Sequence, residues 1–120
     1  MGHENEYENL SPGAYLAMED VAEYKSEYHD GKTFVMAGGI YNHNHLCNRV
    51  GYLLEGALND RDCLVMNSDQ KVYAKDNNSF MYPDVTVFCG PLAHYKERKD
   101  ILINPILIIE VLSNSTKEYD

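Results

Sequence analysis

Long hydrophobic runs are absent from this sequence of 120 residues. The longest aliphatic run, at residues 106–109, is far shorter than the roughly 20 residues that a helix needs to cross a bilayer. The chain does not open with a basic segment followed by an apolar stretch, so no secretion signal is indicated. We therefore expect a soluble, cytoplasmic protein with no membrane partner.

Basic residues are scarce, with 10 lysines and arginines against 19 aspartates and glutamates, for a net charge of −9. Residues 1–30 hold eight of these acids and one base, so most of the excess charge lies there. No basic cluster of the kind that binds nucleic acid is present, and composition alone does not favour such a partner. We expect residues 1–10 to form an acidic flexible leader and residues 11–120 to form one domain.

Cysteine is also rare, at three residues, and no C-x-x-C pair occurs. An odd number of cysteines gives no disulfide framework, and the spacing does not indicate a structural zinc site. We expect Cys47, Cys63 and Cys89 to be reduced, partly buried thiols.

Three local patterns predict the first half of the fold. Ser11 and Pro12 are typical of a helix start, and Tyr15, Leu16, Val21 and Ala22 predict one apolar face on a short helix that ends near Glu23. The Asp30–Gly31 pair predicts a hairpin turn within residues 25–36. Residues 42–59 predict a long helix with one buried apolar stripe, made of Leu46, Val50, Leu53, Leu54, Ala57 and Leu58.

The second half of the sequence predicts strands. We expect them near residues 63–66, 71–74, 85–88 and 106–112, with a polar connection at residues 92–99. The last strand is almost entirely apolar, which is typical of a strand covered on both faces. Helices alternating with strands indicate an α/β or α+β fold, with helices around a central sheet.

Two acids adjoin these apolar strands. Glu110 interrupts the last one, where an ionised carboxylate without a partner is costly, although a strand that leaves the core there would simply expose it. Asp84 follows Pro83 at the start of the preceding strand, where an ordinary turn aspartate is the alternative. Together the two carboxylates form a candidate Mg²⁺ pair.

Other polar residues give weaker signals. Glu27 lies in the predicted hairpin, where an exposed strand residue is the alternative. His43 and His45 open the long helix, but residues two apart do not share a helix face, so a two-histidine metal site is disfavoured. His45 could instead be a polar contact near the sheet. Lys71 and Lys117 are expected at the surface.

Several short stretches together resemble one family, the Uma family of restriction endonuclease-like proteins in the PD-(D/E)XK nuclease superfamily. The resemblance runs from about Ser11 to the last residue, with the motifs in the family's order. They are YKSEYHDG at residues 24–31, MAGG at 36–39 followed by His45, YPDV at 82–85, and EVLSNSTKEYD at 110–120.

This resemblance implies a mixed central β-sheet flanked by α-helices and a Mg²⁺- or Mn²⁺-dependent site that cleaves DNA. Asp84 and Glu110 would match the family's metal-binding acids, and Glu27 its N-terminal acid. The backbone carbonyl of Val111 would be a further metal ligand. His45 would match a histidine at the start of the family's long helix.

One departure from the superfamily concerns lysine. Leu112 stands where the superfamily's lysine would follow the acid, and the family's own lysine would fall beyond Asp120. Lys117 is close to that position and is a candidate accessory residue.

Two functional hypotheses follow. The first is a metal-dependent DNA endonuclease. The second is an inactive, C-terminally short nuclease-like domain that acts as an oligomerising or binding module, because an under-covered strand at residues 106–112 invites pairing with another chain. Both hypotheses include a homodimer or a larger homo-oligomer.

Overall fold

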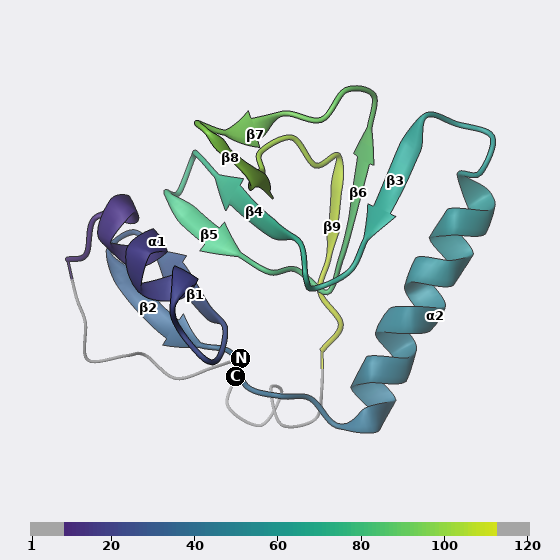
Figure 1. Cartoon of the computed structure of the whole chain (residues 1–120). Helices are drawn as coiled ribbons and strands as arrows, with labels where there is room; N and C mark the ends of the chain where they lie inside the picture. The colour runs from purple at the N-terminus through teal and green to yellow at the C-terminus, as the bar shows by residue number, and fades with distance from the viewer. Residues whose placement is uncertain (1–8, 113–120) are drawn as a thin grey trace. The chain divides into compact units, whose positions relative to one another are not determined.

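The computed structural model describes residues 9–112 of the chain, and its fold is mixed α+β (Figure 1). These residues divide into two compact units. The first unit contains the described residues up to Gly38 together with residues 73–81, and the second contains residues 39–72 and those from Tyr82 onward. No helix within residues 9–112 is long and apolar enough to cross a membrane.

The first unit begins with helix α1 (Pro12–Asp20). Its N-terminus is capped as predicted, because the Ser11 hydroxyl accepts a hydrogen bond from the Ala14 N–H at 3.1 Å. The helix ends three residues before the predicted Glu23. Val21 is 83% exposed and does not extend the apolar face, so that part of the prediction is wrong.

The predicted hairpin is formed by β1 (Ser26–His29) and β2 (Lys32–Val35), which pair in antiparallel fashion. Asp30 and Gly31 have φ values of 47° and 103°, the left-handed backbone that a two-residue hairpin turn requires. On its other side, β1 pairs with β5 (Ser79–Met81), a strand that the sequence patterns did not predict.

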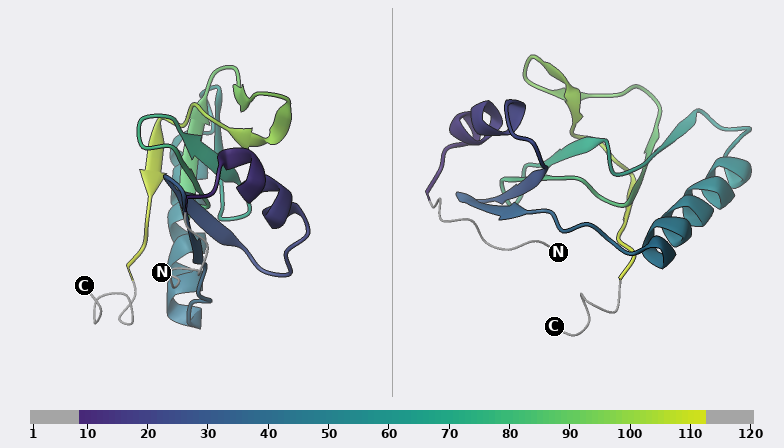
Figure 2. Two further views of the ribbon diagram at one scale, coloured as in Figure 1. Left: turned by 90° about the vertical axis from the view of Figure 1, so that its left-hand side faces the viewer. Right: turned by 60° about the horizontal axis from the view of Figure 1, so that its bottom comes forward.

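Aromatic rings form the core of this unit, where α1 packs on β1 (Figure 2). The ring centroids of Tyr15, Tyr28 and Phe80 lie 5.1–5.8 Å apart, and each residue is at most 1% exposed. The two buried phenol groups donate hydrogen bonds to the carbonyl oxygens of Ser26 and Leu10. The rings can therefore be buried without loss of hydrogen bonding.

The second unit contains the long helix α2 (Tyr41–Ala57), which packs against β3 (Cys63–Met66) and β6 (Val85–Cys89). The helix is confirmed, but its buried stripe is not, since none of its residues is buried. Leu46 and Leu53 are 50% and 60% exposed. The less exposed side of the helix is instead formed by His43, Cys47, Val50, Gly51 and Leu54, and it only partly overlaps the predicted stripe.

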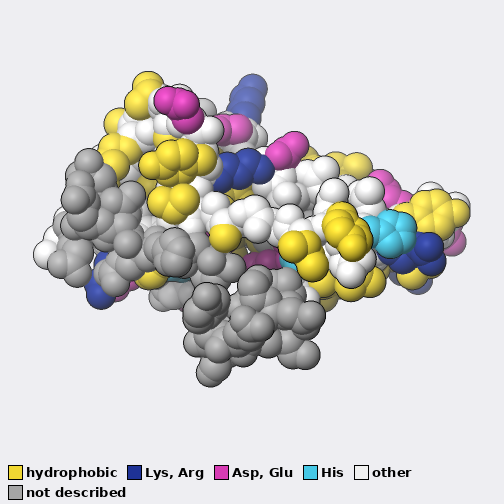
Figure 3. Space-filling model, turned by 90° about the horizontal axis from the view of Figure 1, so that it is seen from below, with side chains coloured by type: hydrophobic (Ala, Val, Ile, Leu, Met, Phe, Trp, Pro, Cys, Tyr) yellow, Lys and Arg dark blue, Asp and Glu magenta, His cyan; other side chains and the backbone are white. Residues whose placement is uncertain are grey.

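Strands β3, β6 and β9 (Leu107–Ile109) form a three-stranded antiparallel sheet, in which β9 is an edge. Leu107 and Ile108 are 43% and 40% exposed, so the prediction that this strand is covered on both faces is wrong. An apolar run predicts a strand. Whether other elements pack on the two faces of that strand depends on the tertiary structure, which no local sequence pattern specifies. Hydrophobic side chains also reach the surface on the face in Figure 3.

A second group of strands in this unit contains both a parallel and an antiparallel pair. The first two residues of β4 (Lys71–Ala74) pair in parallel with β8 (Arg98–Leu102), whereas β7 (His94–Tyr95) pairs with β8 in antiparallel fashion. The predicted polar connection at residues 92–99 thus contains β7 and the start of β8.

The three cysteines do not behave as predicted. Cys63 and Cys89 lie directly opposite each other on β3 and β6 and form a disulfide, which leaves Cys47 as the free cysteine. The expectation of three reduced thiols is therefore wrong. A spacing of 26 residues says nothing about strand register, and it is the register that brings these two sulfur atoms together.

Candidate metal and active site

The register of β6 and β9 brings Asp84 and Glu110 together. Val85 pairs with Ile109; Asp84 comes one residue before Val85, and Glu110 one residue after Ile109. Because the strands are antiparallel, both acids lie at the same end of the pair. The Asp84 N–H donates to Glu110 Oε1 at 3.3 Å, so the two predicted acids are neighbours.

The Asp84 carboxylate is held in place by two further groups. Its Oδ2 atom accepts a hydrogen bond from the Val111 N–H at 2.7 Å and lies 3.2 Å from His43 Nε2. The side chains of Asp84 and His43 are only 17% and 21% exposed. Both contacts use Oδ2, and the other oxygen of the same carboxylate, Oδ1, can serve as a cation ligand.

The start of α2 supplies two side chains to this site, and neither is His45. His45 is exposed, whereas His43 faces Asp84. Cys47 lies one helical turn after His43, with its Sγ atom 3.8 Å from both ring nitrogens. The i, i+4 spacing of His43 and Cys47 places them on one helix face and was the sequence signal that could have identified them.

The electrostatics of the site favour a cation. Burial, as the largest cause, and the negative charges of Asp84 and Glu110 together raise the pKa of the Cys47 thiol from 9.0 to about 11. The thiol is therefore protonated at neutral pH unless a cation offsets this negative charge. Asp84 and Glu110 provide the oxygen atoms that Mg²⁺ prefers, and these residues fit such an ion.

Glu27 belongs to the first unit, where it is 6% exposed. Its Oε1 atom lies 2.9 Å from His29 Nε2, and His29 Nδ1 lies 3.0 Å from Ser79 Oγ. This order of groups resembles a Ser–His–Glu catalytic triad. However, Ser79 is 1% exposed and donates its hydroxyl proton to the Asn77 carbonyl, which argues against a nucleophilic role.

Lysine residues were expected at the surface. Lys71 is instead 6% exposed, with its ammonium group 5.2 Å from the centre of the Tyr82 ring. Tyr82 precedes Asp84 by two residues, so Lys71 contacts the chain segment that leads into the site. Lys117 and residues 113–120 of the last motif lie outside the described residues.

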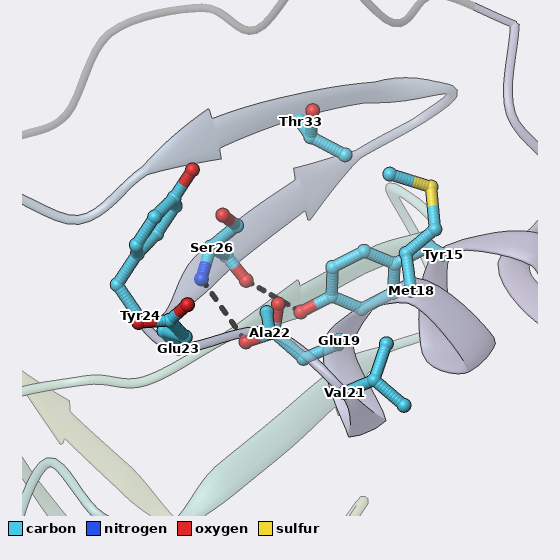
Figure 4. Close-up of a pocket in the computed structure, with 9 residues that line it drawn as sticks. All are labelled: Tyr15, Met18, Glu19, Val21, Ala22, Glu23, Tyr24, Ser26 and Thr33. Atoms are coloured by element: carbon cyan, nitrogen blue, oxygen red, sulfur yellow. Dashed lines mark hydrogen bonds between the residues drawn. The ribbon is translucent and has the colours of Figure 1, made fainter.

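The first unit has a pocket of its own beside α1 (Figure 4). Polar groups in it already bond to one another: the Tyr15 hydroxyl donates to the Ser26 carbonyl, and the Ser26 N–H donates to Glu19. None of the predicted site residues lines this pocket, so it does not extend the candidate site. Its lining consists of Tyr15, Met18, Glu19, Val21, Ala22, Glu23, Tyr24, Ser26 and Thr33.

Comparison with known proteins gives a family match and two sequence relatives. A family model named Uma2, described as "Putative restriction endonuclease", matches residues 12–120. The protein slr1290 of Synechocystis sp. (strain ATCC 27184 / PCC 6803 / Kazusa) is 37% identical over 116 residues, which cover 95% of this chain and 59% of slr1290. The protein sll1609 of the same organism is 33% identical over 111 residues, covering 92% of this chain and 63% of sll1609. This chain therefore spans less than two thirds of the length of either relative.

A solved structure shares the fold. It is a crystal structure from Anabaena variabilis ATCC 29413, described as "a putative nuclease belonging to DUF820". The likeness has a TM-score of 0.71 and 21% sequence identity, and it covers 88% of this chain and 60% of the other. It confirms the restriction-endonuclease-like α+β fold that the motifs implied.

Proposed function

Because the chain belongs to the Uma2 family, described as "Putative restriction endonuclease", we propose that it carries the site of a nuclease that hydrolyses DNA with Mg²⁺ or Mn²⁺. The observation that supports this most is the pairing of Val85 with Ile109, which places Asp84 and Glu110 side by side. Two neighbouring carboxylates at the ends of paired strands are suited to hold a hard cation.

In this proposal Asp84 and Glu110 hold the cation, with the Val111 carbonyl as a further ligand. The bound cation would activate water and neutralise charge on the phosphodiester. Val111, through its N–H group, and His43 fix the direction of the Asp84 carboxylate, since both contact the same oxygen atom. Glu27 stays a predicted catalytic acid, and Lys117 a predicted accessory residue that supplies positive charge.

The test is nicking of supercoiled DNA in the presence of Mg²⁺ or Mn²⁺. We expect Asp84→Asn and Glu110→Gln to reduce the nicking rate by at least about 100-fold, because even groups that only orient metal ligands contribute roughly 10- to 100-fold. Calorimetric titration with Mn²⁺ should show a matching loss of affinity in both variants.

Asp60→Asn is the matched control, because Asp60 is an exposed acid of the same unit. It removes the same charge and should leave nicking and Mn²⁺ binding unchanged. Equal nicking by wild type, Asp84→Asn and Glu110→Gln would refute the proposed site.

A second candidate function is that of an oligomerising module with no nuclease activity. The exposed apolar edge strand β9 favours it, since such an edge can pair with the same strand of a second copy. This function predicts a concentration-dependent dimer in sedimentation velocity and no nicking with either metal ion.

A further inference from the structure

His43, Cys47 and Asp84 form a cluster with a different donor chemistry from that of the two carboxylates. One nitrogen, the sulfur and one carboxylate oxygen all lie within 4.8 Å of one another. Tetrahedral Zn²⁺, with bonds of about 2.0 Å to nitrogen or oxygen and 2.3 Å to sulfur, places its ligand atoms roughly 3.3–3.6 Å apart. The separation of His43 Nε2 from Asp84 Oδ2 is 3.2 Å and from Cys47 Sγ is 3.8 Å, both close to these values.

The backbone prepares this cluster for a metal ion. His43 and Cys47 are one turn apart on the helix α2, so their relative position is fixed by the helix itself. Gly39 packs against the His43 ring: a side-chain carbon at this glycine would lie 3.0 Å from Nδ1. The Val111 N–H restricts the Asp84 carboxylate by donating a hydrogen bond to its Oδ2 atom. Three ligands with restricted positions leave a fourth place for water or substrate, as in zinc sites with an open position.

We infer that His43, Cys47 and Asp84 form a binding site for a Zn²⁺-class cation, and that this cation competes with Mg²⁺ for Asp84. Thiolate and imidazole ligands favour Zn²⁺ and Co²⁺, whereas Mg²⁺ favours oxygen ligands. Asp84 belongs both to the His43–Cys47–Asp84 cluster and to the proposed Mg²⁺ site. A cation bound to His43 and Cys47 would therefore take Asp84 away from the Mg²⁺ site. The competition, though not the binding, rests on the proposed nuclease function.

Binding is tested with Co²⁺, which reports a bound thiolate by its charge-transfer absorption. The titration uses the full chain with its disulfide intact, in a buffer without added thiols. We expect the band in wild type, its loss in Cys47→Ser, and an affinity at least about tenfold weaker in His43→Gln, a loss typical of an altered metal site. His45→Gln removes an exposed histidine from the same helix turn and should match wild type.

Circular dichroism of each variant establishes that it is folded, and Cys47→Ser changes only one atom of the side chain. A missing charge-transfer band in wild type would overturn the inference. An equal band in folded Cys47→Ser would do the same, since the thiolate would then come from elsewhere.

Competition is tested separately, by adding Zn²⁺ to the nicking reaction supported by Mg²⁺. Each rate is compared with the same variant's rate without Zn²⁺. We expect half-inhibition of Cys47→Ser to need at least about tenfold more Zn²⁺ than that of wild type. Equal inhibition of both would overturn the competition. A protein that binds Co²⁺ through Cys47 but never nicks DNA would refute the nuclease proposal and retain the cation site.

Discussion

Asp84 contacts three other residues of the candidate site. Its N–H donates to Glu110, and its carboxylate meets the Val111 N–H and the His43 ring. It also contributes to the electrostatic environment of Cys47. The dipeptide Pro83–Asp84 was visible in the sequence, and a neighbouring acid was expected. The choice of His43 over His45 depends on which side of α2 faces β6, and two histidines two residues apart do not reveal this.

The alkylation rate of Cys47 should reveal how its surroundings change the pKa of its thiol. Burial, as the largest cause, and the negative charges of Asp84 and Glu110 together raise the pKa of the thiol from 9.0 to about 11. In metal-free buffer, the alkylation rate of Cys47 should therefore rise about tenfold per pH unit until the pH approaches 11. Asp84→Asn removes one of the causes and should lower the pKa, so its alkylation at pH 9 should be faster.

The raised pKa of Cys47 also makes the free energy of unfolding depend on pH. Between the ordinary pKa of 9.0 and the raised value of about 11, the folded state binds more protons at Cys47 than the unfolded state does. The contribution of Cys47 to the free energy of unfolding is thus present below pH 9 and is lost as the pH rises toward 11. An alkylation profile with its midpoint near 9 in wild type would contradict this account.

At the scale of elements, strand register decides which side chains meet. The pairing of β3 with β6 joins Cys63 to Cys89, and the pairing of β6 with β9 joins Asp84 to Glu110. The sequence indicated β3, β6 and β9 as separate strands, but a shift of one residue would have separated both pairs. Local patterns located the hairpin turn and the start of α1 because a few adjacent residues determine them.

The disulfide between β3 and β6 should contribute measurably to stability. It closes a loop between residues 26 positions apart, for which loop entropy predicts a contribution of about 2–4 kcal/mol to the free energy of unfolding. The double variant Cys63→Ala, Cys89→Ala should lose this amount in urea denaturation. Wild type under a reductant should lose a similar amount, whereas the double variant should not respond to the reductant.

Thiol counting provides the control. The denatured chain should expose one reactive thiol before reduction and three after it, because only Cys47 is free among three cysteines. Three reactive thiols before reduction would show that the bond does not form.

At the scale of the whole molecule, apolar surface remains exposed within residues 9–112. Leu46 and Leu53 on α2 and Leu107 and Ile108 on β9 are all at least 40% exposed. Curated relatives are longer than this chain, which covers 59% and 63% of them. Exposed apolar strands and helix faces of this kind bind another surface in many proteins.

We expect β9 to mediate self-association if the second candidate function holds. Ile108→Lys should then shift the dimer toward monomer in sedimentation velocity, because a charge on a strand edge opposes pairing with another strand. Ile103→Lys is the matched control, since Ile103 is similarly exposed, at 44% against 40%, but lies outside β9. Equal effects of the two substitutions would exclude β9 as the interface.

The sequence by itself determined both helices, most of the strands and the two acids beside apolar strands, together with the motifs that identified the family. Helix caps, hairpin turns and short motifs are local, and the residues that specify them are adjacent. Tertiary structure alone decided the disulfide, the burial of Lys71 and the choice of His43 and Cys47 as neighbours of Asp84. These features depend on strand register and on the helix side that packs against the sheet, which join residues far apart in the chain.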